Sequence, residues 1–305
     1  SAPVITLPKG FCATIFADGI GQARHLVVAS DGTVYVNARH PKKSSRGMLV
    51  ALKDTKGHGK ADEILVFGDP QGGGTGIDLY KNGLYAENKD RIVRYALTEG
   101  DPVPKGEPEV VISGLPIDGN HVSHAFAIDP DGNLFVGLGS ATNSCQKQDR
   151  IEGSPGRMPC EELKTRGGIW RYDANKTKQT FSPSERYATG LRNAEGIDFD
   201  SAGRVFATQH VRDQLYDNWP ALYSSERGSE MPAEVLVLLS QGGDYGWPFC
   251  YFDGEQQKLV LAPEYGGDGG KAVGSCNEKL PPVAAFPAHW APNDLKIYKG
   301  MQFPP

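Results

Sequence analysis

Two short segments place residues suited to proton transfer and anion binding just before stretches that alternate apolar and polar residues. The first is Gly119–His124, in which His121 lies in a loop after Asn120. A histidine in a loop can act as a general base near neutral pH, and a hydrogen-bonded structural histidine is the alternative. For His124 we favour the structural role. Strand side chains alternate between faces, so histidines three residues apart are not expected to share a metal.

The second segment, Thr189–Gly196, contains Arg192 and Asn193 at the equivalent position of the next repeat. A planar guanidinium and a neighbouring amide suit a polyanionic or quinonoid ligand. The alternative is an arginine paired with a carboxylate from a neighbouring repeat. The spacing alone does not separate the two interpretations.

Two other polar or glycine-rich segments predict turns more than binding sites. Asp54–Asp62 has the outline of a calcium loop, but Lys56 and His58 stand where the metal requires Asp or Asn. We therefore expect a hairpin turn there. Gln71–Gly76 is rich in glycine, but no helix follows to bind a phosphate, so a flexible rim or close backbone approach is expected.

The cysteines number five, an odd count, and none belongs to a CxxC pair, so a zinc site is not expected. Pairing Cys145 with Cys160 and Cys250 with Cys276 would close loops of ordinary size and leave Cys12 single. Each bridge would contribute about 3 kcal/mol through loop-closure entropy. Four buried thiols remain the alternative.

Short strands joined by tight turns must position these residues, because 38 glycines and 22 prolines leave little room for long helices. Four hairpins are predicted at turns around Gly32, Gly83, Gly132 and Gly203. Asp-Gly and Asn-Gly turns of this kind call for positive φ at both central residues. The hairpins recur roughly every 50 to 70 residues, which is typical of β-propeller blades.

We therefore predict an all-β fold, a single six-bladed β-propeller domain over residues 1–305. A β-sandwich is the alternative, but it does not explain a repeat whose turns and strands recur in the same order. Four repeats are clear, 233–265 could form a fifth, and 291–298 resembles the start of another. Because an open propeller leaves strand edges unpaired, we expect about five blades here and the last blade missing.

Charge and hydropathy exclude two classes of partner. Lys plus Arg is 32 and Asp plus Glu is 37, giving a net charge of −5, whereas a nucleic-acid binder needs a clustered cationic face. No run approaches the roughly 18 apolar residues of a membrane span. The first residues, Ser1–Pro3, lack Met and an apolar leader, and are interpreted as a mature end left by signal cleavage or an artificial boundary.

Three segments resemble signature regions of the soluble PQQ-dependent sugar dehydrogenases, in particular the sorbosone and aldose dehydrogenase branch. The first resembles the region of their catalytic histidine, the second their GxRNxxG stretch and the third their NYGWP motif. The resemblance extends over nearly the whole chain. The segments are His121–Val136, Ala188–Gly196 and Gly243–Pro248.

The resemblance implies a six-bladed propeller that oxidises an aldose at C1 by hydride transfer to pyrroloquinoline quinone (PQQ) beside a calcium ion. By position, His121 would be the base and Arg192 would stabilise negative charge on the quinone oxygen. A cytochrome or a quinone would be the electron acceptor. The remaining roles implied by the resemblance are cofactor contacts from Asn193 and His289, calcium ligation by the backbone carbonyls of His210 and Val211, and a substrate contact from Asn120, which replaces an acidic residue of the glucose enzymes.

Two other functions remain as hypotheses. One is a metal-dependent lactonase-type propeller in which Glu195 and Asn193 ligate calcium or zinc and a metal-bound water attacks a lactone. The other is a non-catalytic propeller that binds a carbohydrate or a protein. The resemblance favours a periplasmic or secreted sugar dehydrogenase over both.

Overall fold

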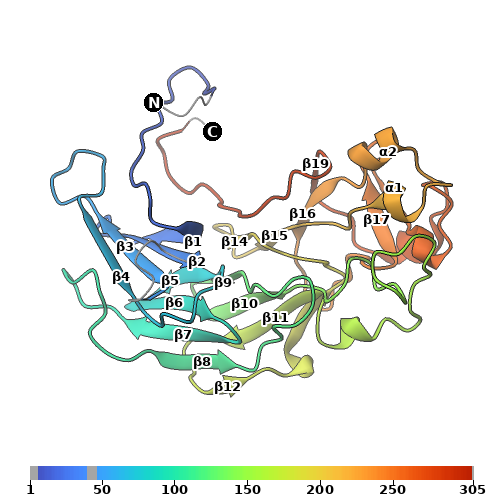
Figure 1. Ribbon diagram of the computed structural model, residues 1–305. Coiled ribbons are helices and arrows are strands. Elements are labelled where there is room, and N and C mark those ends of the chain that lie inside the picture. The colour runs from blue at the N-terminus through green and yellow to red at the C-terminus, as the bar shows by residue number, and fades with distance from the viewer. Residues whose placement is uncertain (1–5, 40–46, 304–305) are drawn as a thin grey trace. The chain divides into compact units, whose positions relative to one another are not determined.

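The computed structural model describes residues 6–39 and 47–303, and the chain divides into two compact units, Ser1–Ile112 and Ser113–Pro305. Each unit is built from antiparallel sheets in which most neighbouring strands are consecutive in the chain (Figure 1). The segment Ser1–Pro3, where a processed end is expected, lies outside the described residues.

The first unit contains two sheets formed from eight strands. In the first sheet, β1 pairs with β2, β2 with β3 and β3 with β4; in the second, β5, β6, β7 and β8 pair in the same stepwise manner. The strands are β1 (Gln22–Val28), β2 (Val34–Arg39), β3 (Leu49–Lys53), β4 (Glu63–Phe67), β5 (Ile77–Tyr80), β6 (Gly83–Asn88), β7 (Arg91–Ala96) and β8 (Glu109–Ser113).

The second unit contains two four-stranded sheets, a separate hairpin and short helices. One sheet has the order β9-β10-β11-β13 and the other β14-β15-β16-β19, while β17 pairs only with β18 among the described strands. The strands are β9 (Phe126–Ile128), β10 (Asn133–Leu138), β11 (Gly168–Asp173), β12 (Gln179–Thr180), β13 (Arg186–Thr189), β14 (Ile197–Phe199), β15 (Val205–Gln209), β16 (Glu234–Leu238), β17 (Cys250–Asp253), β18 (Lys258–Leu261) and β19 (Ala284–Phe286). The α-helices are α1 (Leu215–Asn218) and α2 (Ser225–Glu230), and 3₁₀ turns span Glu161–Lys164, Pro183–Glu185, Pro263–Tyr265 and Gly274–Glu278.

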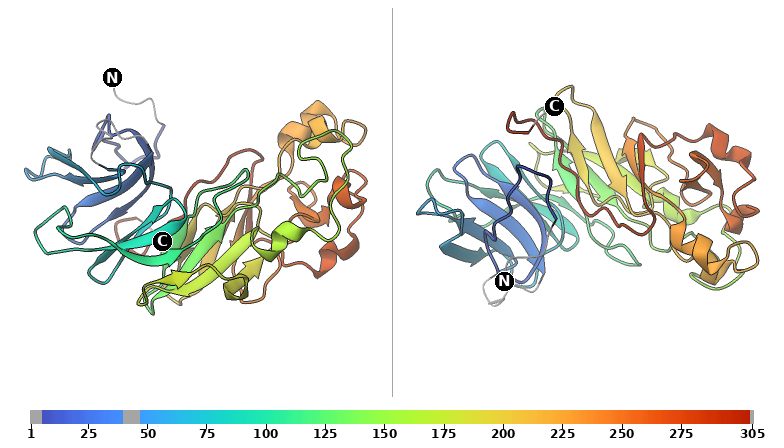
Figure 2. Two further views of the ribbon diagram at one scale, coloured as in Figure 1. Left: turned by 60° about the horizontal axis from the view of Figure 1, so that its bottom comes forward. Right: turned by 90° about the horizontal axis from the view of Figure 1, so that it is seen from above.

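Four-stranded antiparallel sheets formed in chain order are the building unit of a propeller, so the predicted all-β, propeller-like fold is confirmed with four blades. The count of six blades and the missing last blade stay predictions. The views in Figure 2 show each sheet of the second unit as a twisted fan whose colours follow the chain. Right-handed strand twist produces this shape.

The assignment of 233–265 to a fifth blade is wrong. Its first strand, β16, pairs with β15 and β19 and so completes the fourth sheet, which leaves only the β17–β18 hairpin. No strand lies in 291–298 either. Instead the carbonyl of Pro292 accepts from Thr208 Oγ1 at 3.1 Å, and the amide of Ile297 donates to Asp198 Oδ2 at 2.8 Å. This segment is held against the fourth sheet by side-chain oxygens rather than by a ladder.

The hairpin turns form where they were predicted, with one difference in their geometry. Gly32, Gly132 and Gly203 have positive φ, as these turns require. At the hairpin between β5 and β6 the positive φ belongs to Lys81, and Gly83 instead begins β6. The expectation of positive φ at both central residues is therefore wrong, because three of these loops are longer than a two-residue turn and need a single left-handed residue.

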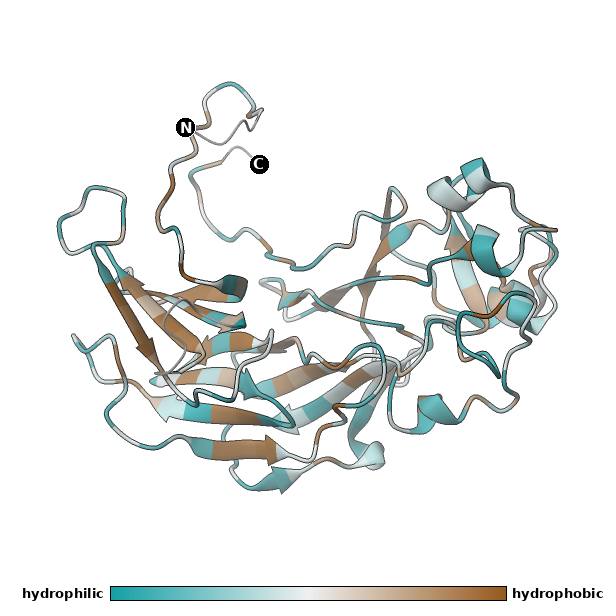
Figure 3. Cartoon of the chain, viewed as in Figure 1, coloured by the Kyte–Doolittle hydropathy of each residue, from teal (hydrophilic) through white to brown (hydrophobic). Residues whose placement is uncertain are grey.

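Hydrophobic residues concentrate on the strands, while the connecting loops carry most of the hydrophilic ones (Figure 3). The core of the second unit joins its two large sheets through buried Phe135, Ile169, Leu191, Ala207 and Val237. Leu191 directly precedes Arg192, so burying Leu191 in this core fixes the backbone from which the guanidinium projects. The core thus sets the position of the predicted site.

Candidate active site

His121 is held in one tautomer by the strand-end loop that follows β10. Its Nδ1 lies 2.8 Å from the carbonyl oxygen of Ser140 and 3.1 Å from Ser140 Oγ, whose own hydroxyl donates to the carbonyl of Thr142 at 2.6 Å. Both oxygens can therefore only accept, and Nδ1 must carry the hydrogen. Nε2 is left with its lone pair, which is the form a general base needs.

The charge state of His121 agrees with this role. Burial lowers the pKa of His121 to about 4, and the positive charges of Arg192 and Arg150 act in the same direction. The imidazole is therefore neutral at physiological pH, in the form that accepts a proton. The amide of Ser140 donates to the carbonyl of Arg192 at 2.7 Å, so the support of His121 and the backbone of Arg192 are joined directly.

Arg192 is almost fully buried, with only 4% of its surface exposed, and each of its three guanidinium nitrogens has a hydrogen-bond partner. Its Nε donates to the carbonyl of Asn143 at 3.1 Å, one terminal nitrogen donates to the carbonyl of His210 at 3.3 Å, and the other lies 3.4 Å from Asp213 Oδ2. Burial lowers the pKa of Arg192 to about 10, against the opposing effect of Asp213. The guanidinium remains charged at neutral pH.

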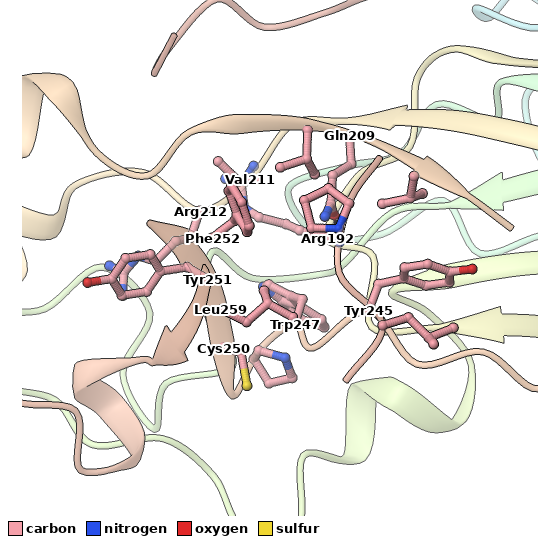
Figure 4. Close-up of a pocket in the computed structure, with 15 residues that line it drawn as sticks. Arg192, Gln209, Val211, Arg212, Tyr245, Trp247, Cys250, Tyr251, Phe252 and Leu259 are labelled. Carbon is pink, nitrogen blue, oxygen red and sulfur yellow. Dashed lines mark hydrogen bonds between the residues drawn. The ribbon is translucent and has the colours of Figure 1, made fainter. Parts of the chain in front are cut away.

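An apolar cavity of about 20 Å³ lies beside Arg192 (Figure 4). Trp247, Phe252 and Leu259 line it, and Arg192 and Gln209 lie at its edge. The indole Nε1 of Trp247 donates to the Asn143 carbonyl at 3.0 Å, the same oxygen that accepts from Arg192. Trp247 of the Trp-Pro motif therefore helps to hold in place the carbonyl oxygen that binds Arg192.

His121 and Arg192 face the same hollow, which has a volume of about 450 Å³ and lies wholly within the second unit. Pockets for small ligands and cofactors usually measure about 300 to 1,000 Å³. The hollow brings together all but one of the predicted catalytic, cofactor-binding and substrate residues. It is lined by Asn120, His121, Arg150, Arg192, His210, Val211, Arg212, Asp213, Glu234, His289 and Ala291.

Arg150 and Asp213 also line the hollow, and neither was predicted from the sequence. Arg150 donates to Asp213 Oδ1 at 2.6 Å, and Asp213 contacts Arg192 as well, so one carboxylate joins two guanidinium groups. Burial raises the pKa of Asp213, but Arg192 and Arg150 outweigh it and the pKa is lowered. A cationic side chain inside the Cys145–Cys160 loop was the available sequence signal for Arg150.

Asn120 and His289 lie at the exposed rim of the hollow. The Asn120 amide donates to Asp149 Oδ2 at 2.9 Å, and His289 Nε2 lies 3.1 Å from the carbonyl of Gly228. Unlike Arg192, both side chains are solvent-accessible. They can contact a bound ligand without first breaking a buried network.

Asn193 does not line the hollow, although its neighbour Arg192 does. Its amide donates to Glu195 Oε1 at 2.9 Å, and the same oxygen accepts from Ser123 Oγ at 2.9 Å. Asn193 and Glu195 are both buried. The structure therefore places Asn193 in the layer behind His121, close to Gly139, where the Asn193 side-chain oxygen would lie 2.6 Å from an added Cβ.

Both predicted disulfides are present, joining Cys145 to Cys160 and Cys250 to Cys276. Cys12 is a free, exposed thiol. The first bridge closes the loop that contains Arg150, and the second joins β17 to the turn Gly274–Glu278. Covalent closure limits the freedom of Arg150 at the edge of the hollow.

A comparison with protein families decides the relationship of the chain, since the family model described as TrAA12-like matches residues 5–302. The chain belongs to the TrAA12-like family. The predicted resemblance is thereby confirmed, because this family and the structural neighbours comprise PQQ-dependent oxidoreductases.

Solved structures and a curated relative extend the comparison. A Trichoderma reesei protein of carbohydrate-active enzyme family AA12 has a TM-score of 0.70 and 18% identity, covering 95% of this chain and 76% of its own. The PQQ domain of pyranose dehydrogenase from Coprinopsis cinerea has a TM-score of 0.72 and 19% identity, covering 93% and 70%. An uncharacterized Borreliella burgdorferi protein is 23% identical over 98% of this chain and 69% of its own. Structural similarity to proteins that are only 18 to 19% identical in sequence establishes the fold of this chain.

The donor set of the hollow fits PQQ, a flat acidic cofactor. Arg192 and Arg150 present two charged guanidinium groups, and Arg212 lies beside them with its charge directed to buried Glu264. Guanidinium forks match carboxylates and quinone oxygens in geometry and charge. The residues present would therefore hold PQQ mainly through Arg192 and Arg150.

The side chains of the hollow do not by themselves form a calcium cage. The carbonyl of His210 accepts from Arg192, and Glu234 Oε2 accepts from the amide of Val211 at 2.9 Å. Across residues 6–39 and 47–303, no three Asp, Glu, His or Cys side chains are grouped to hold a metal. In the Asp54–Asp62 turn, the Asp54 carboxylate accepts from the backbone amides of His58 and Gly59, as a hairpin loop requires.

Proposed function

We propose that the protein is a PQQ-dependent dehydrogenase that oxidises an aldose or a related sugar at C1. The single observation that carries the proposal is that His121 and Arg192 face one hollow, with His121 Nε2 unprotonated and Arg192 charged. Family membership supports an oxidoreductase. The finer assignment rests on the chemistry of these residues.

His121 would receive the proton of the sugar C1 hydroxyl at Nε2. The hydrogen bond from Nδ1 to Ser140 orients the ring and stabilises the imidazolium that forms. When bound, PQQ would supply a two-electron acceptor for the hydride leaving C1. The C1–H bond breaks as the carbonyl forms, so the sugar loses one proton and one hydride.

Arg192 would stabilise the negative charge that grows during the reaction. Its three interactions with Asn143, His210 and Asp213 fix the guanidinium before any ligand arrives, so little reorganisation is needed. Arg150 would add a second cation at the rim. Asn193 would act as a positioning residue behind His121 instead of touching the cofactor.

Rim residues would contact the substrate and cofactor edges. Asn120 presents an amide where an acidic residue would repel an anionic sugar, and His289 offers an imidazole. Calcium stays a prediction from the resemblance, with the carbonyls of His210 and Val211 as its ligands. The structure supplies no side-chain cage for it.

The partners and location follow from the same proposal. A cytochrome or a quinone would take electrons from the reduced cofactor. The two disulfides agree with an oxidising compartment, such as the periplasm or the extracellular space. Within the described part of the chain, no helix is both long and apolar enough to cross a membrane.

Reconstitution tests the proposal against its alternatives. The purified protein would be incubated with PQQ, with and without calcium, and assayed with aldoses and an artificial electron acceptor. We expect dye reduction that requires PQQ. Dye reduction that also requires calcium would support the calcium ion that the resemblance implies.

Metal-dependent lactone hydrolysis without PQQ would instead support the lactonase hypothesis, in which Asn193 and Glu195 were the expected ligands. Asn193 and Glu195 share a hydrogen bond, and no third ligating side chain joins them among the described residues. Inertness in both assays would leave a non-catalytic binding propeller. Either result would refute the dehydrogenase.

A further inference from the structure

A second hollow, of about 380 Å³, adjoins the one that contains His121 and Arg192. Three residues, Arg150, Asp213 and His289, line both hollows, so the two are continuous around the Arg150–Asp213 ion pair. Apart from Arg150, Asp213 and His289, the residues that line it have no role in the sequence motifs or in the proposed chemistry. Its volume falls within the usual range of small-ligand pockets.

The ion pair between the two hollows is held firmly on both sides. Arg150 donates to Asp213 Oδ1 and to Gln214 Oε1, each at 2.6 Å. Asp213 receives a further constraint, because its amide donates to Asn143 Oδ1 at 3.1 Å. A ligand that extends from one hollow to the other would therefore lie against the fixed Arg150–Asp213 ion pair.

The second hollow offers an aromatic ring next to hydrogen-bonding groups. Tyr216 is 41% exposed, and a Cβ added at Gly228 would lie 2.7 Å from the Tyr216 Cβ, so α1 and α2 approach closely there. Asp217 and Ser225 add a carboxylate and a hydroxyl. A ring face provides flat apolar contact while carboxylate, amide and hydroxyl groups pair with hydroxyls.

This combination matches a pyranose ring, which presents axial C–H bonds on a face and hydroxyls around its edge. A bulky apolar ligand would leave Asp217 and Gln214 unpaired. A polyanion would be repelled by Asp213 and Asp217, because these two carboxylates outnumber the single arginine that lines this hollow. The chemistry therefore favours a neutral, hydroxyl-rich ligand.

We propose that the second hollow is a subsite for the second sugar unit of a substrate whose reducing-end unit lies at His121. The proposal rests on the proposed function and specifies its substrate class: di- or oligosaccharides with a free reducing end are preferred over monosaccharides. The second sugar ring would stack on Tyr216 and form hydrogen bonds with Asp217, Ser225 and Gln214.

Paired kinetics test the preference. Glucose is compared with cellobiose and maltose, which share its reducing-end unit, in the PQQ-loaded protein. We expect a higher kcat/KM for at least one disaccharide, expressed mainly in KM. In Tyr216→Ala the ratio of disaccharide to monosaccharide kcat/KM falls about 3- to 10-fold, because the stacking contact is lost. Asp217→Asn lowers the same ratio.

A matched control separates the subsite from general damage. Tyr298 is 48% exposed and lies in the same unit but outside both hollows, so Tyr298→Ala keeps the wild-type ratio. An unchanged ratio in Tyr216→Ala overturns the proposal, as does a wild-type preference for glucose over both disaccharides.

A binding measurement distinguishes failure of this inference from failure of the proposed function. Saturation-transfer NMR with methyl β-cellobioside, which has no free C1 hydroxyl, needs neither PQQ nor turnover. We expect transfer to the non-reducing ring in the wild type and its loss in Tyr216→Ala. No transfer in the wild type, or equal transfer in the variant, refutes the subsite whatever the dye assay shows. Absent dye reduction with every sugar refutes the dehydrogenase alone.

Discussion

The protonation of His121 gives the sharpest test of the site. Burial and the charge of Arg192 lower the pKa of His121 to about 4, against an ordinary value of 6.5. At pH 5 an imidazole with a pKa of 4 is about 90% neutral, whereas one with a pKa of 6.5 is about 3% neutral. In the cofactor-free protein the His121 ring is therefore expected to stay neutral down to about pH 5.

The same shift affects stability, and its sign follows from proton binding. Between pH 6.5 and about 4 the unfolded chain binds a proton at His121 that the folded chain does not bind, so stability falls as the pH falls. From pH 7 to pH 5 the loss is about 1 to 2 kcal/mol. Replacing His121 by Asn removes this contribution and leaves the other ionisable groups in place.

Two measurements on the cofactor-free protein check these values. Long-range ¹H–¹⁵N spectra follow the seven histidines through the pH range, and His121→Asn identifies the signal of His121. Urea denaturation at pH 7 and pH 5 compares wild type with the variant. A His121 ring that titrates near pH 6.5, with equal pH dependence of stability in both proteins, would refute the assignment of a buried neutral base.

Catalysis gives an independent readout of the same residue. Loss of a general base lowers rates by about 10²- to 10⁴-fold. In the PQQ-loaded protein, kcat of His121→Ala is expected to fall within this range while the cofactor affinity stays close to that of the wild type. Retained turnover would remove His121 from the proton transfer.

Three further predictions concern the groups around the hollow. Arg192→Ala is expected to weaken PQQ binding about 10- to 100-fold, because charged hydrogen bonds are lost, and to lower kcat. Fluorescence titration measures the affinity and dye reduction measures kcat. An unchanged affinity would contradict the assignment of Arg192 to the cofactor. Replacing Cys145 and Cys160 by Ser should cost about 3 kcal/mol in denaturant unfolding and weaken PQQ binding through Arg150, because the bridged cysteines are 15 residues apart. Arg212→Met leaves the Glu264 carboxylate buried without its cation, so a loss of about 3 to 5 kcal/mol is expected, and a loss below 1 kcal/mol would show that Trp219 and Ser144 suffice as donors.

Local signals predicted the hairpins because a turn is specified by its own residues. Asp129 and Asp200 each begin a loop in which their carboxylates accept from backbone amides two and four residues later, and a glycine adopts positive φ. These contacts span a few residues and leave a visible pattern. The position of β16 could not be predicted in this way, since its partner β19 lies about 50 residues further along the chain.

The candidate site was predicted in part for the same reason. His121 and Arg192 stand at strand ends within recognisable segments, and both line the hollow. Asn143 was missed because its role depends on Arg192 and Asp213, which are 49 and 70 residues away. The side chain of Asn193 was expected at the cofactor, but its direction is set by Glu195, whose burial no local pattern reveals.

The fixed conformation of the Arg192 side chain affects how the cofactor would bind. A cation that is already oriented by two backbone carbonyls and a carboxylate has little motional freedom left to lose when a ligand docks. Capture should then be limited by diffusion and by water leaving the hollow, with slow release afterwards. A preset cation therefore favours a cofactor complex that, once formed, dissociates slowly.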